Sequence, residues 1–149
     1  MALNRDFIGR TYSSGASYEV SRVKIREFAA AIGDDNPIYR DREAAAAAGH
    51  PDVVAPPTFP IVFSLAGGGE ALADPELGLN YAMVVHGEQR FEYNRPIYAG
   101  DELVIRSTIT EIRSAGMHEL LTIRSDVATA AGEYVCTTYN TIVERGGAG

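Results

Sequence analysis

The sequence predicts an α+β fold in which a helix covers one face of an antiparallel sheet. Between residues 21 and 74 the apolar residues recur at helical spacing, and from residue 81 onward they alternate with polar ones. Helices followed by a run of strands are typical of α+β proteins. The 149 residues, 46% of them hydrophobic, suffice for one core, so we expect a single domain over residues 1–149.

The first helix is predicted over residues 21–32, "SRVKIREFAAAI", where Ser21 can cap the start and Gly33 can end it. Its expected buried stripe consists of Val23, Ile25, Phe28, Ala29 and Ile32. Pro37 forces Asn36 out of the α region, which makes "DDNP" a turn. We expect two more helices after this turn.

The second helix is short and lies in "DREAAAAAG", which ends at Gly49. The third follows the proline-rich, extended "HPDVVAPPTFP" and lies in "IVFSLAGGGEALAD", whose length and apolarity predict a buried central helix. A phosphate-binding loop is the alternative reading of its three glycines, Gly67 to Gly69. Close packing of the helix on a sheet is the better account, because no strand precedes them.

Four later segments alternate and are rich in β-branched or aromatic residues: "VVHGEQRFEY", "DELVIRSTITEI", "HELLTIRSDV" and "EYVCTTYNTIV". Turns at Gly100-Asp101, Ala115-Gly116 and Ala131-Gly132 separate these four segments, and "SYEV" near the N-terminus is one more strand candidate. The strand tyrosines are expected to pack in the core or across strands. Such a sheet leaves an edge or a face to be covered, which favours a dimer.

Composition excludes several classes of function. The net charge of −7, without any run of basic residues, argues against nucleic acid, and no segment approaches the ~20 apolar residues that span a membrane. The lone cysteine, Cys136, cannot form an internal disulfide, which fits the cytoplasm. His50, His86 and His118 are far apart in sequence, so we expect no metal site. No cofactor is expected either.

The stretch "IGDDNPIY" raises the question of a catalytic site. Asp34, fixed just past a helix and beside the amide of Asn36, has the parts of a general base with an oriented water. Asp and Asn also favour turns and helix ends, so a purely conformational role is the alternative.

The longer stretch "FAAAIGDDNPIYRDREAA" resembles the signature of the MaoC-like (R)-specific enoyl hydratases and 3-hydroxyacyl dehydratases, Gly-Asp-x-Asn-Pro-aliphatic-His. "GEQRFEYNRPIYAGDEL" resembles the same family's downstream strand and turn, and the resemblance covers roughly residues 5 to 145. It implies a hot-dog fold, a curved antiparallel sheet wrapped around a long central helix. It also implies that two such units pair to form acyl tunnels.

The resemblance assigns the catalytic role to Asp34, but two family features are altered. Tyr39 stands at the position of the family's histidine, and an unperturbed tyrosine, with a pKa near 10, is a poor base at neutral pH. Where the family places His-Gly at the start of the central helix, this chain has Pro56-Pro57-Thr58-Phe59. Proline has no N–H to bind a developing oxyanion, unless Thr58 or Phe59 takes that role.

This combination resembles the non-catalytic A-type subunit of the mycolic-acid-type (3R)-hydroxyacyl-ACP dehydratase. It implies a dehydratase subunit that shapes the acyl tunnel in a heterodimer, while a catalytic hot-dog partner supplies the Asp/His pair. A self-sufficient homodimeric enoyl-CoA hydratase or thioesterase, using Asp34 with His50 or His86, is one alternative. A non-enzymatic acyl-thioester binding module is the other.

The ligand under all three readings is an acyl-CoA or acyl-ACP thioester. The predicted substrate-binding residues are Asn36, Tyr39, Pro57, Thr58, Phe59 and His86. His86 is expected on the strand face shared with Glu88, Arg90 and Glu92, as a solvated or interface histidine or as a substitute base. Candidates to receive the phosphates of the carrier are Arg40, Arg42, Arg90 and Arg95.

Overall fold

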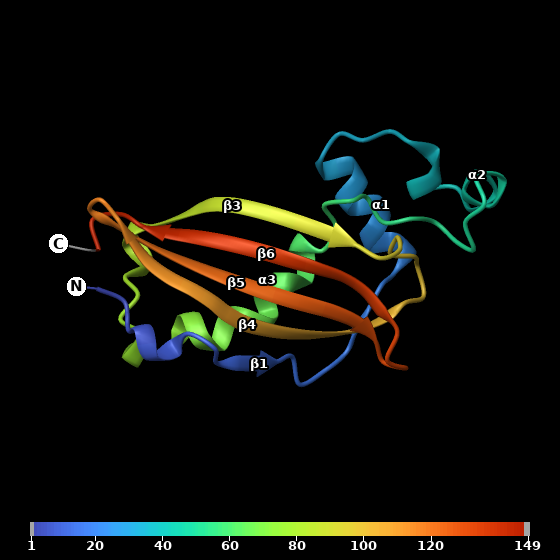
Figure 1. The fold of residues 1–149 in the computed structure, drawn as a ribbon. Helices are drawn as coiled ribbons and strands as arrows, with labels where there is room; N and C mark the ends of the chain where they lie inside the picture. The colour runs from blue at the N-terminus through green and yellow to red at the C-terminus, as the bar shows by residue number, and fades with distance from the viewer. Residues whose placement is uncertain (1, 148–149) are drawn as a thin grey trace.

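An antiparallel sheet curves around one helix in the computed structural model of the chain, which describes residues 2–147 apart from the side chains of residues 65–67 (Figure 1). The helices are α1 (Arg22–Ala31), α2 (Arg42–Ala47) and α3 (Ile61–Ala73). Short 3-10 turns are η1 (Arg5–Phe7), η2 (Pro37–Tyr39), η3 (Pro75–Leu77) and η4 (Tyr81–Met83). The strands are β1 (Thr11–Ser13), β2 (Tyr18–Glu19), β3 (Val84–Tyr93), β4 (Glu102–Ala115), β5 (His118–Thr129) and β6 (Tyr134–Glu144).

Helix α1 starts and ends as predicted. The Ser21 hydroxyl accepts a hydrogen bond from the Lys24 N–H, which caps the first turn. Ile25 and Ala29 are fully buried, but Val23 is 60% exposed, so its assignment to the buried stripe was wrong. Val23 lies about 200° around the helix from Ile25 at 100° per residue, on the solvent side. Ile32 is 49% exposed as well, because it is the C-cap beyond the packed turns.

The sheet has the strand order β1-β4-β5-β6-β3, with β2 also paired to β4, and all its pairs are antiparallel. The four long predicted strands are confirmed. "SYEV" contributes only the two residues of β2, and β1 was not predicted because three residues carry little periodicity. Among the described residues β3 pairs with β6 alone, which leaves its other side a free edge.

Helix α3 runs across the inner face of the sheet and packs against β1, β4 and β5 (Figure 1). A Cβ added to Gly68 would lie 2.9 Å from Cδ1 of Ile123 on β5, so glycine permits this close approach. Phe59 and Phe63 pack in one apolar cluster near the start of α3, and Ala71 packs in a second near its end. Gly68 therefore supports close packing of the helix on the sheet, rather than phosphate binding, as the reason for this glycine.

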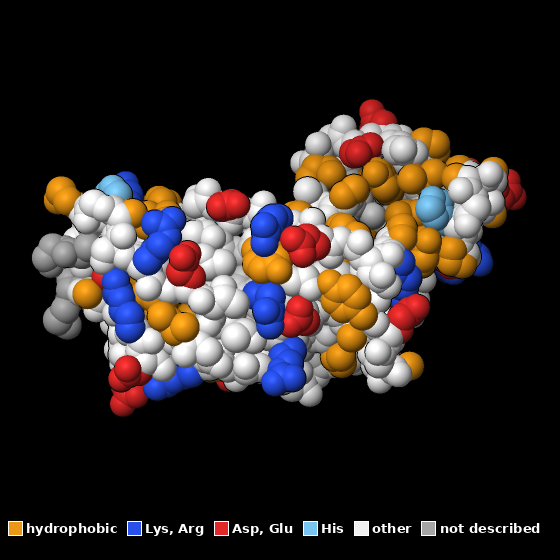
Figure 2. Space-filling view, in the orientation of Figure 1, with side chains coloured by type: hydrophobic (Ala, Val, Ile, Leu, Met, Phe, Trp, Pro, Cys, Tyr) orange, Lys and Arg blue, Asp and Glu red, His pale blue; other side chains and the backbone are white. Residues whose placement is uncertain are grey.

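The outer face of the sheet is polar and carries acidic and basic side chains side by side (Figure 2). These charges pair along the strands, in Arg90–Glu92, Arg113–Glu111 and Arg124–Asp126. The Arg90 guanidinium also lies 4.0 Å from the centroid of the Tyr139 ring. The charged partners of Arg90 are therefore already on this face.

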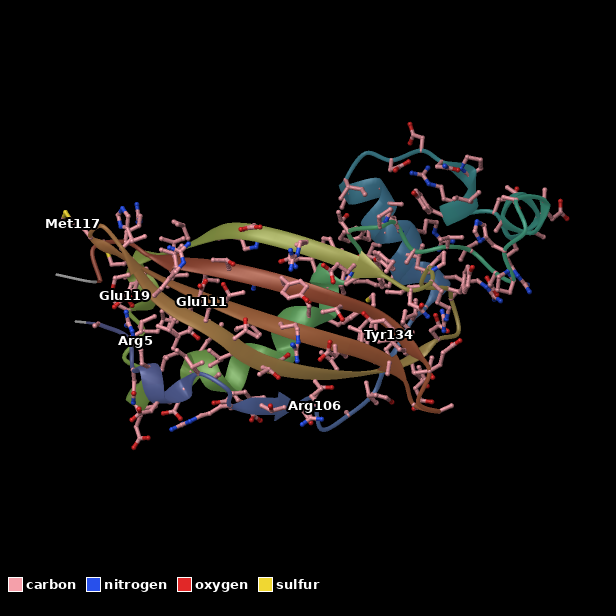
Figure 3. The ribbon with its side chains drawn as sticks, viewed as in Figure 1. Arg5, Arg106, Glu111, Met117, Glu119 and Tyr134 are labelled. Atoms are coloured by element: carbon pink, nitrogen blue, oxygen red, sulfur yellow. The ribbon has the colours of Figure 1, made fainter. Side chains whose placement is uncertain are left out.

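The N-terminal segment is attached to the end of the β4–β5 hairpin. Both guanidinium nitrogens of Arg5 bond the carboxylate of Glu119, at 2.8 and 2.9 Å, and the Ser114 hydroxyl donates a third bond to it (Figure 3). Glu119 is fully buried, so these bonds satisfy a charge removed from water.

Within residues 2–147, no helix has both the length and the apolarity to cross a membrane.

Candidate functional site

An apolar pocket of about 340 Å³ lies where the end of β3 meets η2 and the extended segment before α3. Its lining residues are Ile38, Tyr39, Val54, Ala55, Pro57, Tyr93, Asn94, Arg95 and Pro96. The pocket thus brings together Tyr39 and Pro57, which were predicted to bind substrate. An apolar cavity with few polar groups is the usual form of a small-ligand site.

The turn before the pocket is held by its own side chains. Asp34 Oδ1 accepts a hydrogen bond of 3.0 Å from the Asn36 N–H, and Asn36 Oδ1 accepts one of 3.2 Å from the Ile38 N–H. Asn36 thereby caps η2, which Pro37 begins. Asp34 is half-buried, whereas the side chain of Asn36 is used in this cap. Asp34 and Asn36 therefore stabilise the turn, and the residues that follow them, Ile38 and Tyr39, line the pocket.

Tyr39 ends this turn and lines the pocket. Only 7% of its surface is exposed to solvent. Burial raises the pKa of its hydroxyl, and the charge of Asp34 raises it further. The hydroxyl therefore stays protonated at neutral pH. In this state Tyr39 can donate a hydrogen bond but cannot take up a proton.

The segment before α3 is tied to β3 through Tyr93. The Tyr93 hydroxyl donates a 2.7 Å hydrogen bond to the Pro57 carbonyl oxygen. The Phe59 N–H is already used, because it donates to the Pro56 carbonyl oxygen at 2.8 Å. The Phe59 side chain is fully buried in the core rather than in the pocket wall. Thr58 is exposed, and its N–H has no acceptor among the described residues.

His86 lies at the opposite end of β3 from the pocket residue Tyr93. His86 opposes Ile142, and the bulge between His86 and Glu88 puts it on the inner face, where its Nε2 lies 3.3 Å from Gln89 Oε1. The prediction that it shares a face with Glu88 was wrong, because the bulge breaks the alternation. Seven residues of strand separate His86 from Tyr93, about 23 Å at 3.3 Å per residue. The two ends of β3 thus hold different parts of the predicted site.

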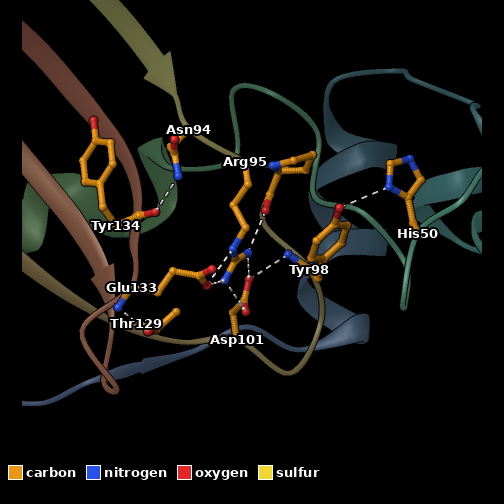
Figure 4. Close-up of polar contacts among 9 residues, drawn as sticks. His50, Asn94, Arg95, Tyr98, Asp101, Thr129, Glu133 and Tyr134 are labelled. Carbon is orange, nitrogen blue, oxygen red and sulfur yellow. Dashed lines mark hydrogen bonds and ion pairs between the residues drawn. The ribbon is translucent and has the colours of Figure 1, made fainter.

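His50 is the imidazole at the pocket end of the molecule. Its Nδ1 lies 3.3 Å from the Tyr98 hydroxyl (Figure 4), and Tyr98 forms a β-bridge with the pocket residue Val54. His118 lies at the opposite hairpin, where its Nδ1 accepts a hydrogen bond from the Gly146 N–H.

Tyr93 was predicted only to pack, but it is a pocket residue as well. Burial raises the pKa of the Tyr93 hydroxyl, and the neighbouring Cys136 raises it further. Burial also raises the pKa of the Cys136 thiol, to about 12, so this cysteine is not a thiolate at neutral pH. The sequence does indicate β3, but it does not show that the strand's last residue reaches the loop before α3.

Arg95 holds the turn that follows β3. Its guanidinium bonds Asp101 at 2.9 and 3.0 Å and Glu133 at 2.9 Å (Figure 4). Hydrogen bonding to Asp101 is the largest of the effects that raise its pKa. The other predicted phosphate-binding arginines are also near acids: Arg40 near Asp35, Arg42 near Asp52 and Arg90 near Glu92. Each of these four cations therefore already has an acidic partner within the chain.

Comparisons with known proteins place this site in a family context. Residues 6–138 match the family described as FAS1-like, dehydratase domain region. A UPF0336 protein of Thermobifida fusca is 56% identical over 148 residues, which cover 99% of this chain and 97% of that protein.

Two solved structures are similar in both fold and sequence. A MaoC-like dehydratase superposes with a TM-score of 0.87 at 35% identity over 93% of this chain, which spans only 42% of that longer chain. The C-terminally truncated HadBC (3R-hydroxyacyl-ACP dehydratase) complex of Mycobacterium tuberculosis gives 0.85 at 28% identity, over 95% of this chain and 99% of that one. The expected hot-dog fold is confirmed.

Proposed function

Because the chain belongs to the family of the FAS1-like dehydratase domain region, we propose that it is a subunit of a (3R)-hydroxyacyl thioester dehydratase. In this proposal the chain forms part of the wall around a bound acyl thioester. A catalytic hot-dog partner, of the same fold, supplies the intact Asp/His pair that moves the proton of the departing water. The name of the HadBC complex, which contains a (3R)-hydroxyacyl-ACP dehydratase, supports this reaction class.

The state of Tyr39 is the observation that carries the proposal. Removal of water from a 3-hydroxyacyl thioester requires a group that accepts a proton and a group that delivers one to the leaving hydroxyl. Tyr39 stands at the pocket wall where the family has histidine, and burial and Asp34 both raise its pKa. It can hold a ligand oxygen by donation, but it cannot act as the base. In this proposal a second subunit brings that group.

The free edge of β3 supports a partner-dependent role. Several apolar side chains on or just before this strand are substantially exposed: Tyr81 by 58%, Met83 by 37%, Val85 by 40% and Tyr93 by 38%. A long edge strand with exposed apolar residues is a site for pairing with another strand. Because Tyr93 also lines the pocket, a partner on this edge would lie next to the bound ligand.

The test is an assay of the purified chain with and without candidate hot-dog partners. The substrates are crotonyl-CoA and longer enoyl-CoA thioesters, with hydration followed by loss of the enoyl absorbance. We expect negligible turnover by the chain alone and turnover by the co-purified complex. Stereospecific hydration by the homogeneous chain, at a rate typical of enzymes, would contradict the proposal.

A self-sufficient homodimeric hydratase or thioesterase is the second candidate, favoured by one observation. His50 lies at the pocket end of the molecule, against Tyr98, and a homodimer would present Asp34 and His50 twice. In that case Asp34→Asn abolishes turnover by the pure chain. A non-enzymatic binding module predicts tight thioester binding without turnover in any pairing. A cytoplasmic location, CoA or ACP as the carrier and the absence of a cofactor are parts of the same proposal.

A further inference from the structure

A layer of polar side chains divides the core between the two apolar clusters. Ser107 on β4, Ser125 on β5 and Thr138 on β6 oppose one another in register across the inner face of the sheet. All three are at least 98% buried, and the hydroxyls of the two serines bond each other at 2.8 Å. Val127 and Cys136 belong to the cluster on one side of this row, and Ile109, Ile123 and Ile142 belong to the cluster on the other side.

Helix α3 adds a fourth hydroxyl to this layer. Ser64 lies one turn before Gly68, which packs on Ile123, so both project from the same side of the helix. Phe63 packs in the first cluster and Ala71 in the second, so α3 runs from one cluster to the other. Ser64, 4% exposed, therefore lies over the row that contains Ser125.

Four polar atoms of this region are buried without a hydrogen-bond partner among the described side chains and backbone. They are Ser64 Oγ, Gln89 Nε2, Thr138 Oγ1 and Asn140 Oδ1. Asn140 and Gln89 oppose each other on β6 and β3, on the same face as Thr138. A buried polar group without a partner costs about 1–3 kcal/mol. Because Asn140 opposes Ile123 on β5, the four atoms belong to two adjacent rows of the inner face, which together form the polar layer. Four unpartnered atoms in these rows indicate that something else completes their hydrogen bonds.

The layer is open at one side. Helix α3 packs against β1, β4 and β5, whereas β3 is the edge strand on the other side of β6. Gln89, on β3, is only half-buried, although its Nε2 is not accessible. The β3 side of the layer is therefore the side away from α3, and Tyr93 of the pocket lies on the same strand.

We propose that this polar layer is a binding subsite for a hydroxyl group carried by the acyl chain of the ligand, far from the thioester. A hydroxyl fits the free atoms, because it accepts from Gln89 Nε2 and donates to Asn140 Oδ1. Four residues of strand separate Tyr93 from Gln89, about 13 Å at 3.3 Å per residue. The group is therefore remote from the carbon at which dehydration occurs.

This inference rests on the proposed acyl-thioester function and makes it more specific, since it selects chains with an oxygen substituent. A water molecule has the same hydrogen-bonding chemistry as a hydroxyl. A bound water and a ligand hydroxyl are distinguished by measuring whether a hydroxyl on the acyl chain increases its affinity. Calorimetric titration of the whole chain with dodecanoyl-CoA, and with dodecanoyl-CoA hydroxylated at each successive carbon of the distal half, is the direct experiment.

We expect one hydroxyl position to bind about tenfold more tightly than the unsubstituted chain, the gain of one well-made hydrogen bond. Binding of dodecanoyl-CoA with no gain at any position would overturn the subsite and leave the proposed function intact. Failure of every thioester to bind would instead overturn the proposed function, and the subsite with it.

A variant of Asn140 tests the same layer, both by ligand preference and by the stability of the free protein. Asn140→Leu removes the acceptor with little change of shape, so the preference for the hydroxylated chain should disappear while dodecanoyl-CoA still binds. The melting temperature of the free protein should stay equal or rise, because a buried unpartnered group is lost. Thr141→Val, on the opposite face of the same strand, is the control and should keep the preference. A lower melting temperature for Asn140→Leu, together with equal affinity for both ligands in the unaltered protein, identifies structural water and contradicts the proposal.

Discussion

The hydroxyl of Tyr93, the last residue of β3, donates a 2.7 Å hydrogen bond to the carbonyl oxygen of Pro57, just before α3. This bond joins two walls of the pocket across 36 residues of sequence. Proline has no N–H, so the only strong polar group that Pro57 presents is this carbonyl oxygen. Tyr93 thus holds this turn by donating a hydrogen bond to its carbonyl oxygen.

Tyr93→Phe should lower the free energy of unfolding by about 1 kcal/mol, the typical net value of one hydrogen bond, because the ring remains in place. Urea denaturation at neutral pH measures this change. Tyr139→Phe is the matched control: the Tyr139 ring lies under Arg90 on the outer face and keeps that contact without its hydroxyl. Equal losses in both variants would show that the bond to Pro57 contributes nothing.

Tyr39→His should give the isolated chain measurable hydratase activity, because it restores the acid/base pair with Asp34. General acid–base catalysis contributes about 10²–10⁴-fold, so we expect a gain within this range. The rate of crotonyl-CoA hydration is the measurement.

The control for this variant is the double change Asp34→Asn with Tyr39→His. It should return activity to that of the unaltered chain if Asp34 is the second member of the pair. Equal activity of the single and double variants would show that any turnover comes from elsewhere, and would remove Asp34 from the site.

Much of the fold could be predicted from the sequence because its signals are local. Ser21, Gly33 and Gly49 mark helix ends through their own backbone preferences, and each marks one in the structure. The four long strands follow from alternation over ten or more residues. Val23 was assigned to the buried stripe because it is apolar, but its angular position around α1 puts it on the solvent side.

The site could be predicted only in part, since its members meet through tertiary contacts. Asp34 and Tyr39 are near each other in sequence, and both lie at the pocket end of the chain. The contribution of Tyr93 depends on the segment before α3, which lies against the end of β3 and accepts the hydrogen bond of its hydroxyl. The position of His86 depends on the bulge at Gly87, where a Cβ would lie 2.8 Å from Val143 Cγ2, a constraint invisible to a period-two pattern.

Removal of Arg5 should destabilise the protein more than removal of an exposed arginine. Arg5→Ala leaves the fully buried carboxylate of Glu119 without its charged partner, and we expect a loss of about 2–3 kcal/mol. Arg113→Ala breaks the exposed pair with Glu111 on the same hairpin and should cost less than about 0.5 kcal/mol. Guanidinium denaturation of the two variants compares them directly, and equal losses would contradict the structural role given to Arg5.

The contact between Arg22 and Asp52 makes stability depend on pH. Hydrogen bonding to Arg22 lowers the pKa of Asp52 to about 2. A folded-state pKa below the unfolded value of ~3.9 gives stability that is present above pH ~4 and is lost as the pH falls through about 2. Half of the Arg22 side chain is exposed, so after solvent screening we expect about 1 kcal/mol.

Asp52→Asn should therefore cost about 1 kcal/mol at pH 7 and almost nothing below pH ~2, measured by urea denaturation across this range. Asp35→Asn is the control, because the Asp35 side chain is 93% exposed beside Arg40 and should change stability little at any pH. A cost for Asp52→Asn that does not vary with pH would show that the loss comes from its shape and not from its charge.

The two glycines in the middle of α3 should respond in opposite ways to alanine. No atom of the described residues lies within 4 Å of a Cβ at Gly69, so Gly69→Ala should stabilise the protein by about 0.5–1 kcal/mol through helix propensity. A Cβ at Gly68 would lie 2.9 Å from Ile123 Cδ1, so Gly68→Ala should destabilise by about 1 kcal/mol through overpacking.

Ile123→Val tests this cause, because it removes the methyl group that the new Cβ would meet. Alone it should cost about 0.5–1.5 kcal/mol, but combined with Gly68→Ala the loss should be smaller than the sum of the two by at least about 0.5 kcal/mol. Thermal unfolding of the three variants closes the cycle. Strict additivity would mean that α3 does not press on β5 at Gly68, and that this glycine is there for another reason than close packing.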